Sequence, residues 1–207
     1  MGVNVPARFS VSAGAVILAA AACCFGAAQL LALVFIAVAV HELGHYFALR
    51  LCCGSFTEIR LSITGVTMRH KAPATYMGEI LTAAAGPAAS AVLSAAAACA
   101  ARLIESAFAY RLAGVSLLFC LFNMLPFFSL DGGRILYASV ARAFGLLAAD
   151  RVSCIASCAV IFLALCAGAY VLAVTGMNFT LLLTAVWMLI YYCKNGNNSI
   201  KSHYIEI

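Results

Sequence analysis

The sequence predicts an all-α membrane protein, a bundle of about six transmembrane helices with a short β-hairpin on the cytoplasmic side. Of its 207 residues, 66% are hydrophobic and only 9% are charged. Apolar stretches close to or above the roughly 20 residues that cross a bilayer as a helix recur along nearly the whole chain. The polar residues gather in a short start, a loop near residues 54–76 and a tail from Lys194. No sizeable soluble domain is therefore expected.

The apolar stretches predict spans at about 10–27, 30–51, 77–101, 112–130, 153–174 and 178–193. We interpret the first as a retained helix, although Arg8 and the small residues after it are also typical of a signal peptide. If the N-terminus is cytoplasmic, only Arg102 and Arg111 of the 12 Lys and Arg residues fall on the outer side. This bias predicts six spans with both termini in the cytoplasm, and we expect a bacterial cell membrane.

Two segments have a distinct pattern. The third span is built almost entirely of small residues, so it should let neighbouring helices approach closely. Residues 56–69 alternate apolar and polar side chains around Gly65, which predicts the hairpin. The hairpin has either a structural role or the role of an edge to which an extended peptide adds as a strand.

The charge distribution argues against a nucleic-acid-binding protein, and the positions of the cysteines argue against a disulfide framework. The net charge of +5 comes from scattered single residues, so we expect no nucleic-acid partner. Most of the 10 cysteines lie inside hydrophobic segments and are expected to pack as small apolar side chains. Cys154 and Cys158 could instead bind a metal, and Cys52-Cys53 could be palmitoylated, but packing is the interpretation that we favour.

An HExxH motif stands late in the second span, at His41-Glu42-Leu43-Gly44-His45. On a helix, residues four apart share a face, so both imidazoles can reach one Zn²⁺ while Glu42 serves as a base for the attacking water. Because ionisable residues inside a membrane are costly, the motif indicates a functional site. The alternative is a buried polar cluster that only fastens helices together.

Asp131 is the candidate for the third ligand that a catalytic zinc needs. It ends the fourth predicted span, which runs in the same direction as the second, so the two ends should lie at comparable depth. Pro126 interrupts that helix, and Gly132-Gly133 allows tight turns, so irregular backbone is expected there. Arg134 is expected to be a cytoplasmic anchor, and His70 and His203 to be surface residues.

Asn123 and Pro126 are candidates for contact with the substrate. Asn123 could donate a hydrogen bond to an oxyanion or hold the substrate backbone, or it could only pack helices. Pro126 is assigned to substrate binding.

Three stretches resemble the site-2 protease family of intramembrane metalloproteases. They are HELGH at 41–45, AAAGP at 83–87 and NMLPFFSLDGGR at 123–134. The small six-span form is most similar to the bacterial branch that includes the sporulation factor IV B protease, which processes a sigma-factor precursor. The resemblance implies that His41, His45 and Asp131 hold one Zn²⁺ and that Glu42 is the base.

The sequence also departs from this family. No inserted PDZ domain is expected, and the tail from Lys194 leaves no room for a CBS domain. Ser90 stands where the family often has Asn, which weakens the polar role expected there. We expect a single protease domain over residues 1–193 and a short cytoplasmic tail over 194–207. The expected partners are a membrane-associated substrate, the lipid bilayer and a regulatory membrane protein.

The predicted activity is hydrolysis of a peptide bond in a membrane-associated protein. Candidate substrates are a pro-sigma factor, an anti-sigma factor, a remnant signal peptide and a pheromone precursor. One alternative is a catalytically inactive relative that binds membrane segments. Another is a metal or proton transporter, which would need a polar path that the outer halves of the spans do not provide.

Overall fold

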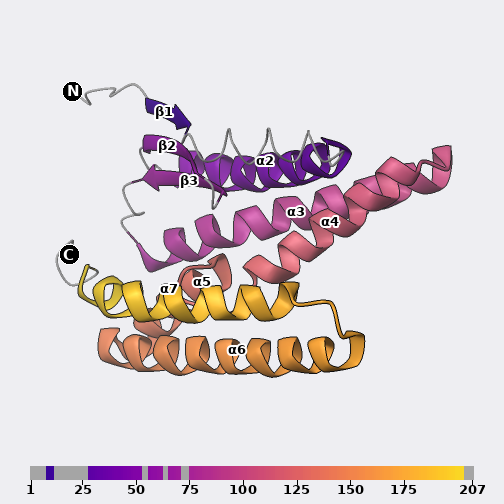
Figure 1. The fold of residues 1–207 in the computed structure, drawn as a ribbon. Helices are drawn as coiled ribbons and strands as arrows, with labels where there is room; N and C mark the ends of the chain where they lie inside the picture. The colour runs from indigo at the N-terminus through magenta and orange to yellow at the C-terminus, as the bar shows by residue number, and fades with distance from the viewer. Residues whose placement is uncertain (1–7, 12–27, 53–55, 63–64, 71–74, 203–207) are drawn as a thin grey trace. The chain divides into compact units, whose positions relative to one another are not determined.

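The computed structural model describes residues 8–11, 28–52, 56–62, 65–70 and 75–202. The chain forms two compact units, Met1–Met124 and Leu125–Ile207, which are described separately. The first contains β1 (Arg8–Val11), α2 (Ala28–Leu51), β2 (Phe56–Ser62), β3 (Gly65–His70), α3 (Tyr76–Ile104) and α4 (Ala107–Asn123) (Figure 1). The second contains α5 (Asp131–Phe144), α6 (Leu146–Thr175) and α7 (Thr180–Ser202).

In the first unit, α3 packs against both α2 and α4, and α2 also contacts α4. Thr75 caps the start of α3 by accepting a hydrogen bond from the backbone of Gly78 at 3.1 Å. At the other end, Glu105 adopts a left-handed conformation (φ 48°), and Ser106 then caps α4. The connection between α3 and α4 is therefore only two residues long, which keeps the two helices adjacent.

The first unit also holds a three-stranded sheet in the order β1-β2-β3. β1 is parallel to β2, and β2 is antiparallel to β3, with an irregular register between Phe56 and Glu58. β2 and β3 lie in the range for which the alternating pattern predicted a hairpin. β3 is an edge strand of this sheet, and it contacts α2.

In the second unit, α6 packs against both α5 and α7. Its buried core contains Phe127, Ile161 and Met188. The ring of Phe128 stacks on that of Tyr191 with 5.7 Å between centroids, and the backbone N–H of Phe128 donates to Ser157 Oγ at 3.0 Å. The segment before α5 is therefore anchored to both α6 and α7.

Within the described residues, three helices are long and apolar enough to cross a membrane, judged by length and composition. They are Gln29–Leu51, Tyr76–Ile104 and Leu146–Thr175. These correspond to three of the predicted spans, and α4 is a shorter apolar helix. The count of six spans stays a prediction. Residues 12–27 of the first predicted span lie outside the described part of the chain, and its first two residues belong to β1.

The predicted fourth span, 112–130, is wrong at its C-terminal end. α4 covers Ala107–Asn123, and residues 124–130 form a non-helical link. Pro126 has no backbone N–H to donate and disfavours helix at the residue before it, which accounts for the break. The chain becomes helical again at Asp131, so this residue begins α5 rather than ending a span. At the C-terminal end, α7 continues past Lys194 to Ser202.

Candidate metal centre

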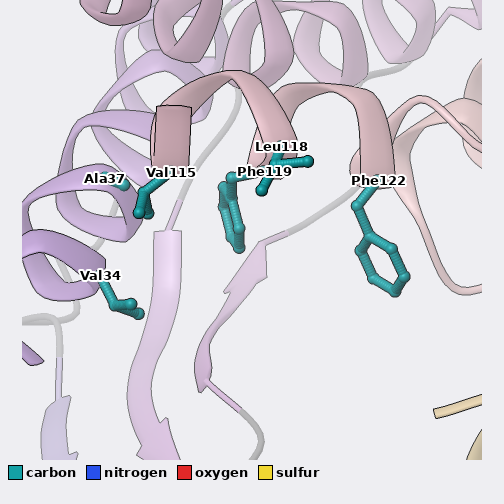
Figure 2. A pocket seen from close by; sticks show the side chains of 6 residues that line it. All are labelled: Val34, Ala37, Val115, Leu118, Phe119 and Phe122. Atoms are coloured by element: carbon teal, nitrogen blue, oxygen red, sulfur yellow. The ribbon is translucent and has the colours of Figure 1, made fainter. Parts of the chain in front are cut away.

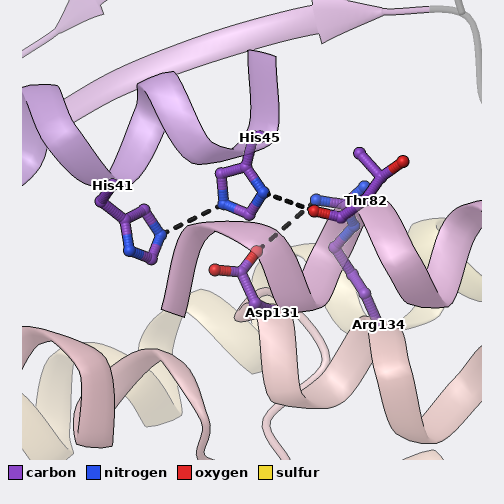
Figure 3. Close-up of polar contacts among 5 residues, drawn as sticks. All are labelled: His41, His45, Thr82, Asp131 and Arg134. Carbon is purple, nitrogen blue, oxygen red and sulfur yellow. Dashed lines mark hydrogen bonds and ion pairs between the residues drawn. The ribbon is translucent and has the colours of Figure 1, made fainter. Parts of the chain in front are cut away.

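The two histidines of the motif lie side by side on α2, as their spacing of four residues predicted. Figure 3 shows the rings of His41 and His45 facing each other, with Nε2 of one 3.1 Å from Nε2 of the other. The ring centroids are 4.8 Å apart and the planes lie at 80°. The two Nε2 atoms, rather than the Nδ1 atoms, therefore converge.

Both Nδ1 atoms have partners on α3. Nδ1 of His45 donates to the backbone carbonyl of Thr82 at 2.8 Å (Figure 3). Since a carbonyl can only accept, this contact leaves the Nε2 lone pair of neutral His45 available to a metal. Nδ1 of His41 lies 3.0 Å from Ser90 Oγ, a hydroxyl that is able to accept the same kind of bond.

Gly86 lies directly against the converging nitrogens. A Cβ at this position would come 2.8 Å from His41 Nε2 and closer still to His45 Nε2. Thr82, Gly86 and Ser90 are all buried and follow one another at intervals of four residues, so they form one face of α3. This face provides two hydrogen-bond partners and, between them, a position without a side chain at the Nε2 atoms.

On the side of α4, the surroundings of the histidine pair are apolar. His41 is only 3% exposed, and the ring of Phe119 on α4 packs edge-on against it at 4.8 Å. On its other side Phe119 helps to line a groove of about 370 Å³ between α2 and α4 (Figure 2). Its lining is entirely apolar: Val34, Ala37, Val115, Leu118, Phe119 and Phe122. Glu42, the neighbour of His41 on α2, is half-buried.

The histidine pair fits a tetrahedral metal ion. Two nitrogens each about 2.05 Å from zinc, at a tetrahedral angle, lie about 3.3 Å apart. The observed separation of 3.1 Å between the Nε2 atoms is close to that value. The Nδ1 contacts agree with the same use, because metal-binding histidines usually hold their second nitrogen in a hydrogen bond.

Asp131 belongs to the second unit, where it is the first residue of α5 and is buried. Its Oδ1 lies 3.5 Å from Nη1 of Arg134, one turn further along the helix (Figure 3). A carboxylate in the first turn is also favoured by the helix dipole. Arg134, expected to be a cytoplasmic anchor, forms an ion pair with the predicted ligand.

Gly132 and Gly133 do not form the irregular turn that was predicted, because both lie in the first turn of α5. A Cβ on Gly133 would clash with the backbone carbonyl of Phe127 and lie 3.0 Å from the Cα of Phe128. This glycine therefore permits the link before α5 to pass close to the helix. It does so without an unusual backbone conformation.

Asn123 and Pro126, the predicted substrate contacts, stand in different units. Asn123 ends α4, and its side-chain amide donates to the carbonyl of Phe119 at 2.9 Å. It thus lies one turn from the ring that contacts His41. Pro126 lies in the link before α5 and is partly exposed.

Sequence reasoning missed three residues of this site, Thr82, Gly86 in its steric role, and Ser90. The expectation that a serine at position 90 has a weak polar role is wrong, since Ser90 is fully buried and contacts His41. The interval of four residues along α3 was the signal that could have found them. It was hidden in a run of small residues that also predicts plain helix packing.

Comparisons with known proteins agree with this chemistry. Residues 99–167 match the family model for peptidase family M50. A zinc metalloprotease of Methanocaldococcus jannaschii is 31% identical over 136 residues, which are 61% of this chain and 38% of the relative. The chain thus spans about two fifths of that relative.

A solved structure, the site-2 protease from Methanocaldococcus jannaschii, shares the fold with a TM-score of 0.63. It is 21% identical, and the alignment covers 91% of each chain. The family match and the curated relative support the M50, or site-2 protease, family of zinc metalloproteases. Together with the three long apolar helices, these matches support an integral membrane protein.

Proposed function

We propose that this chain is an intramembrane zinc metalloendopeptidase of the site-2 protease type, which hydrolyses a peptide bond in a membrane-associated protein. The observation that carries the proposal is the convergence of two imidazole Nε2 atoms at 3.1 Å over Gly86. Both Nδ1 atoms have hydrogen-bond partners on α3, which leaves the Nε2 atoms for a metal. Asp131 is the proposed third ligand, and the two imidazoles and one carboxylate form a set suited to one Zn²⁺ per chain.

Glu42 is the proposed general base. When bound, zinc supplies the Lewis acidity that makes water a nucleophile near neutral pH. Glu42 takes a proton from the attacking water as its oxygen bonds to the peptide carbonyl carbon. It then gives that proton to the leaving nitrogen as the C–N bond breaks, which yields one carboxyl and one amino terminus. The alternative of an inactive segment-binding relative is not favoured, because the residues for this chemistry are present.

Asn123 is proposed to stabilise the oxyanion or to hold the substrate backbone, and Pro126 to contact the substrate. The Asn123 amide donates to the carbonyl of Phe119 within its own helix. To act on a substrate, it must exchange that carbonyl for the substrate oxygen. Its position one turn from Phe119, and hence near His41, supports the assignment.

The substrate is proposed to bind as an unwound segment. A helix engages its carbonyls in internal hydrogen bonds, so cleavage requires local unwinding. β3 is an edge strand and contacts α2, the helix that carries the motif, which supports the addition of an extended substrate as a further strand. A membrane-associated sigma-factor precursor in sporulation is the finer proposal, and it depends on the resemblance to that branch.

The proposed setting is the bacterial cell membrane, with both termini in the cytoplasm. Residues 1–193 are proposed to act as one protease domain, with residues 194–207 as a short tail. A regulatory membrane protein is the proposed further partner. No nucleic acid is proposed as a partner.

The zinc content of the detergent-purified protein tests the ligand set. We expect about one zinc per chain in the wild type and in His70→Ala, a control histidine outside the motif, and loss in His41→Ala and Asp131→Ala. A folded, metal-supplemented wild type without zinc would leave the inactive relative as the better proposal.

Cleavage is tested with Glu42→Gln, which keeps the size of the side chain and removes its basicity. This variant should retain zinc and lose cleavage by roughly a hundredfold or more. Glu105→Gln, at an exposed glutamate on the turn after α3, should behave as wild type. Membrane-protein fragments that are present with wild type and absent with Glu42→Gln identify the substrate, and equal cleavage by both would remove Glu42 from its role.

A further inference from the structure

Ser90 is a polar residue with no place in the proposed reaction, yet it is fully buried on α3. It stands in a helix of small apolar residues, where an alanine would serve packing equally well. Its Oγ lies 3.0 Å from Nδ1 of His41. Burying a hydroxyl is unfavourable unless it is hydrogen-bonded, so this contact accounts for the serine.

The two histidines are oriented by different kinds of partner. His45 is held by the backbone carbonyl of Thr82, which no substitution at position 82 removes. His41 is held by a side chain, which a substitution does remove. The apolar ring of Phe119, which also packs against His41, cannot replace the hydrogen bond. A substitution at position 90 can therefore remove the Nδ1 contact of His41, whereas no substitution at position 82 removes that of His45.

We propose that Ser90 is a positioning residue, which accepts a hydrogen bond from Nδ1–H of His41 and so keeps the Nε2 lone pair directed at the metal. This inference rests on the proposed zinc site. Without the bond, the imidazole can rotate about its side-chain torsions or place its proton on Nε2, and either change withdraws a ligand. Loss of such partners typically weakens metal binding by roughly 10- to 100-fold.

Ser94 provides a matched control for this contact. It lies one turn further along the same helix, and its hydroxyl also accounts for one hydrogen bond, to the carbonyl of Ala113 on α4 at 2.8 Å. Ser90→Ala and Ser94→Ala thus remove the same group from the same helix and each break one polar contact. Only the first contact involves a histidine of the motif. Alanine favours helix and adds no volume, so both variants should fold.

The test measures zinc affinity of the full-length protein in detergent by competition with a chromophoric chelator. It also records the visible absorption of the Co²⁺-substituted protein, which reports the geometry of the ligands. We expect Ser90→Ala to bind zinc at least about tenfold more weakly and to shift the Co²⁺ bands, with Ser94→Ala unchanged.

Two results would overturn the role of Ser90 and leave the protease proposal intact. One is equal zinc affinity and Co²⁺ absorption in Ser90→Ala and wild type. The other is an equal loss in both serine variants, which would indicate a general effect on helix packing. Absence of zinc binding in the wild type would instead overturn the proposed function together with this inference.

Discussion

Gly86 is the residue whose side chain, or lack of one, decides whether the histidine pair is accessible to a metal. Its α-carbon faces the two Nε2 atoms so closely that a Cβ at this position would lie 2.8 Å from Nε2 of His41. We predict that Gly86→Ala lowers zinc affinity by at least about tenfold, because the methyl group occupies the ligand side of the imidazoles and displaces them. Zinc titration of the purified variant measures the effect.

Gly114→Ala is the control for this substitution. Gly114 lies on α4 in the same unit, and a Cβ there would meet no atom within 4 Å. Its zinc affinity should equal that of the wild type. Wild-type affinity in Gly86→Ala as well would mean that the metal does not bind on the Nε2 side of the pair.

At the scale of residues, the sequence predicted what is local and missed what is distant. The HExxH spacing was enough to predict that His41 and His45 share a face, because helix geometry alone decides it. Ser90 contacts His41 across 49 positions of sequence, and no local pattern encodes such a pairing. The Arg134–Asp131 ion pair could have been predicted, since residues three apart on a helix are neighbours. It was missed because position 131 was assigned to the end of a span.

At the scale of elements, close packing of α2 on α3 depends on Gly44, the residue before His45. A Cβ on Gly44 would lie 2.5 Å from the carbonyl oxygen of Ala85 and 2.8 Å from Ala89 Cβ. We predict that Gly44→Ala destabilises the protein by roughly 1–3 kcal/mol, because the helices must separate to admit the methyl group. Thermal unfolding in detergent measures the change.

Gly114→Ala is again the control, because it changes helix propensity with no steric cost. It should be neutral or stabilising by up to about 1 kcal/mol. If Gly44→Ala were as stable as Gly114→Ala, the two helices would not be held at the observed distance. Gly44→Ala and Gly86→Ala also separate two effects, since the first should act mainly on stability and the second mainly on zinc.

Helix boundaries were predictable where composition changes sharply and not where it is uniform. The spans at 77–101 and 153–174 agree with α3 and α6 to within a few residues at one end or both. α5 was missed as a helix because it is short and because its second and third residues are glycines, which lower helix propensity. The end of α4 was missed because mostly apolar residues continue from Leu112 through Phe128, and only Asn123 and Pro126 mark the interruption.

At the scale of the whole molecule, the membrane class followed from composition alone, since a chain with 66% hydrophobic residues cannot bury them all in a core of its own. The family resemblance followed from three short stretches. The number of spans did not follow, because hydropathy finds apolar segments but length decides whether each one crosses. With 17 residues, α4 is about 26 Å long, somewhat short of a hydrocarbon core of roughly 30 Å.

The distribution of basic residues predicts how the chain is oriented in the membrane. Basic residues favour the cytoplasmic side, and only Arg102 and Arg111 were assigned to the outer side. We expect a fluorescent protein fused after Ile207 to report a cytoplasmic C-terminus. A reporter fused after Glu105, between α3 and α4, should report the outer side, since three predicted spans separate the two points. Alkaline phosphatase at the same positions, which is active only outside, should give the opposite pattern.

Reporters on the same side at both positions would mean that an even number of segments crosses after residue 105. α4 would then be the first candidate for a segment that does not cross the membrane. It is short for a full span, while α6 has 30 residues. Such a result would also place the C-terminal tail outside the cell if Glu105 is outside. Opposite sides would instead require an odd number of crossings after residue 105, which the three predicted spans provide. In that arrangement α4 crosses by local thinning of the bilayer, as short spans do.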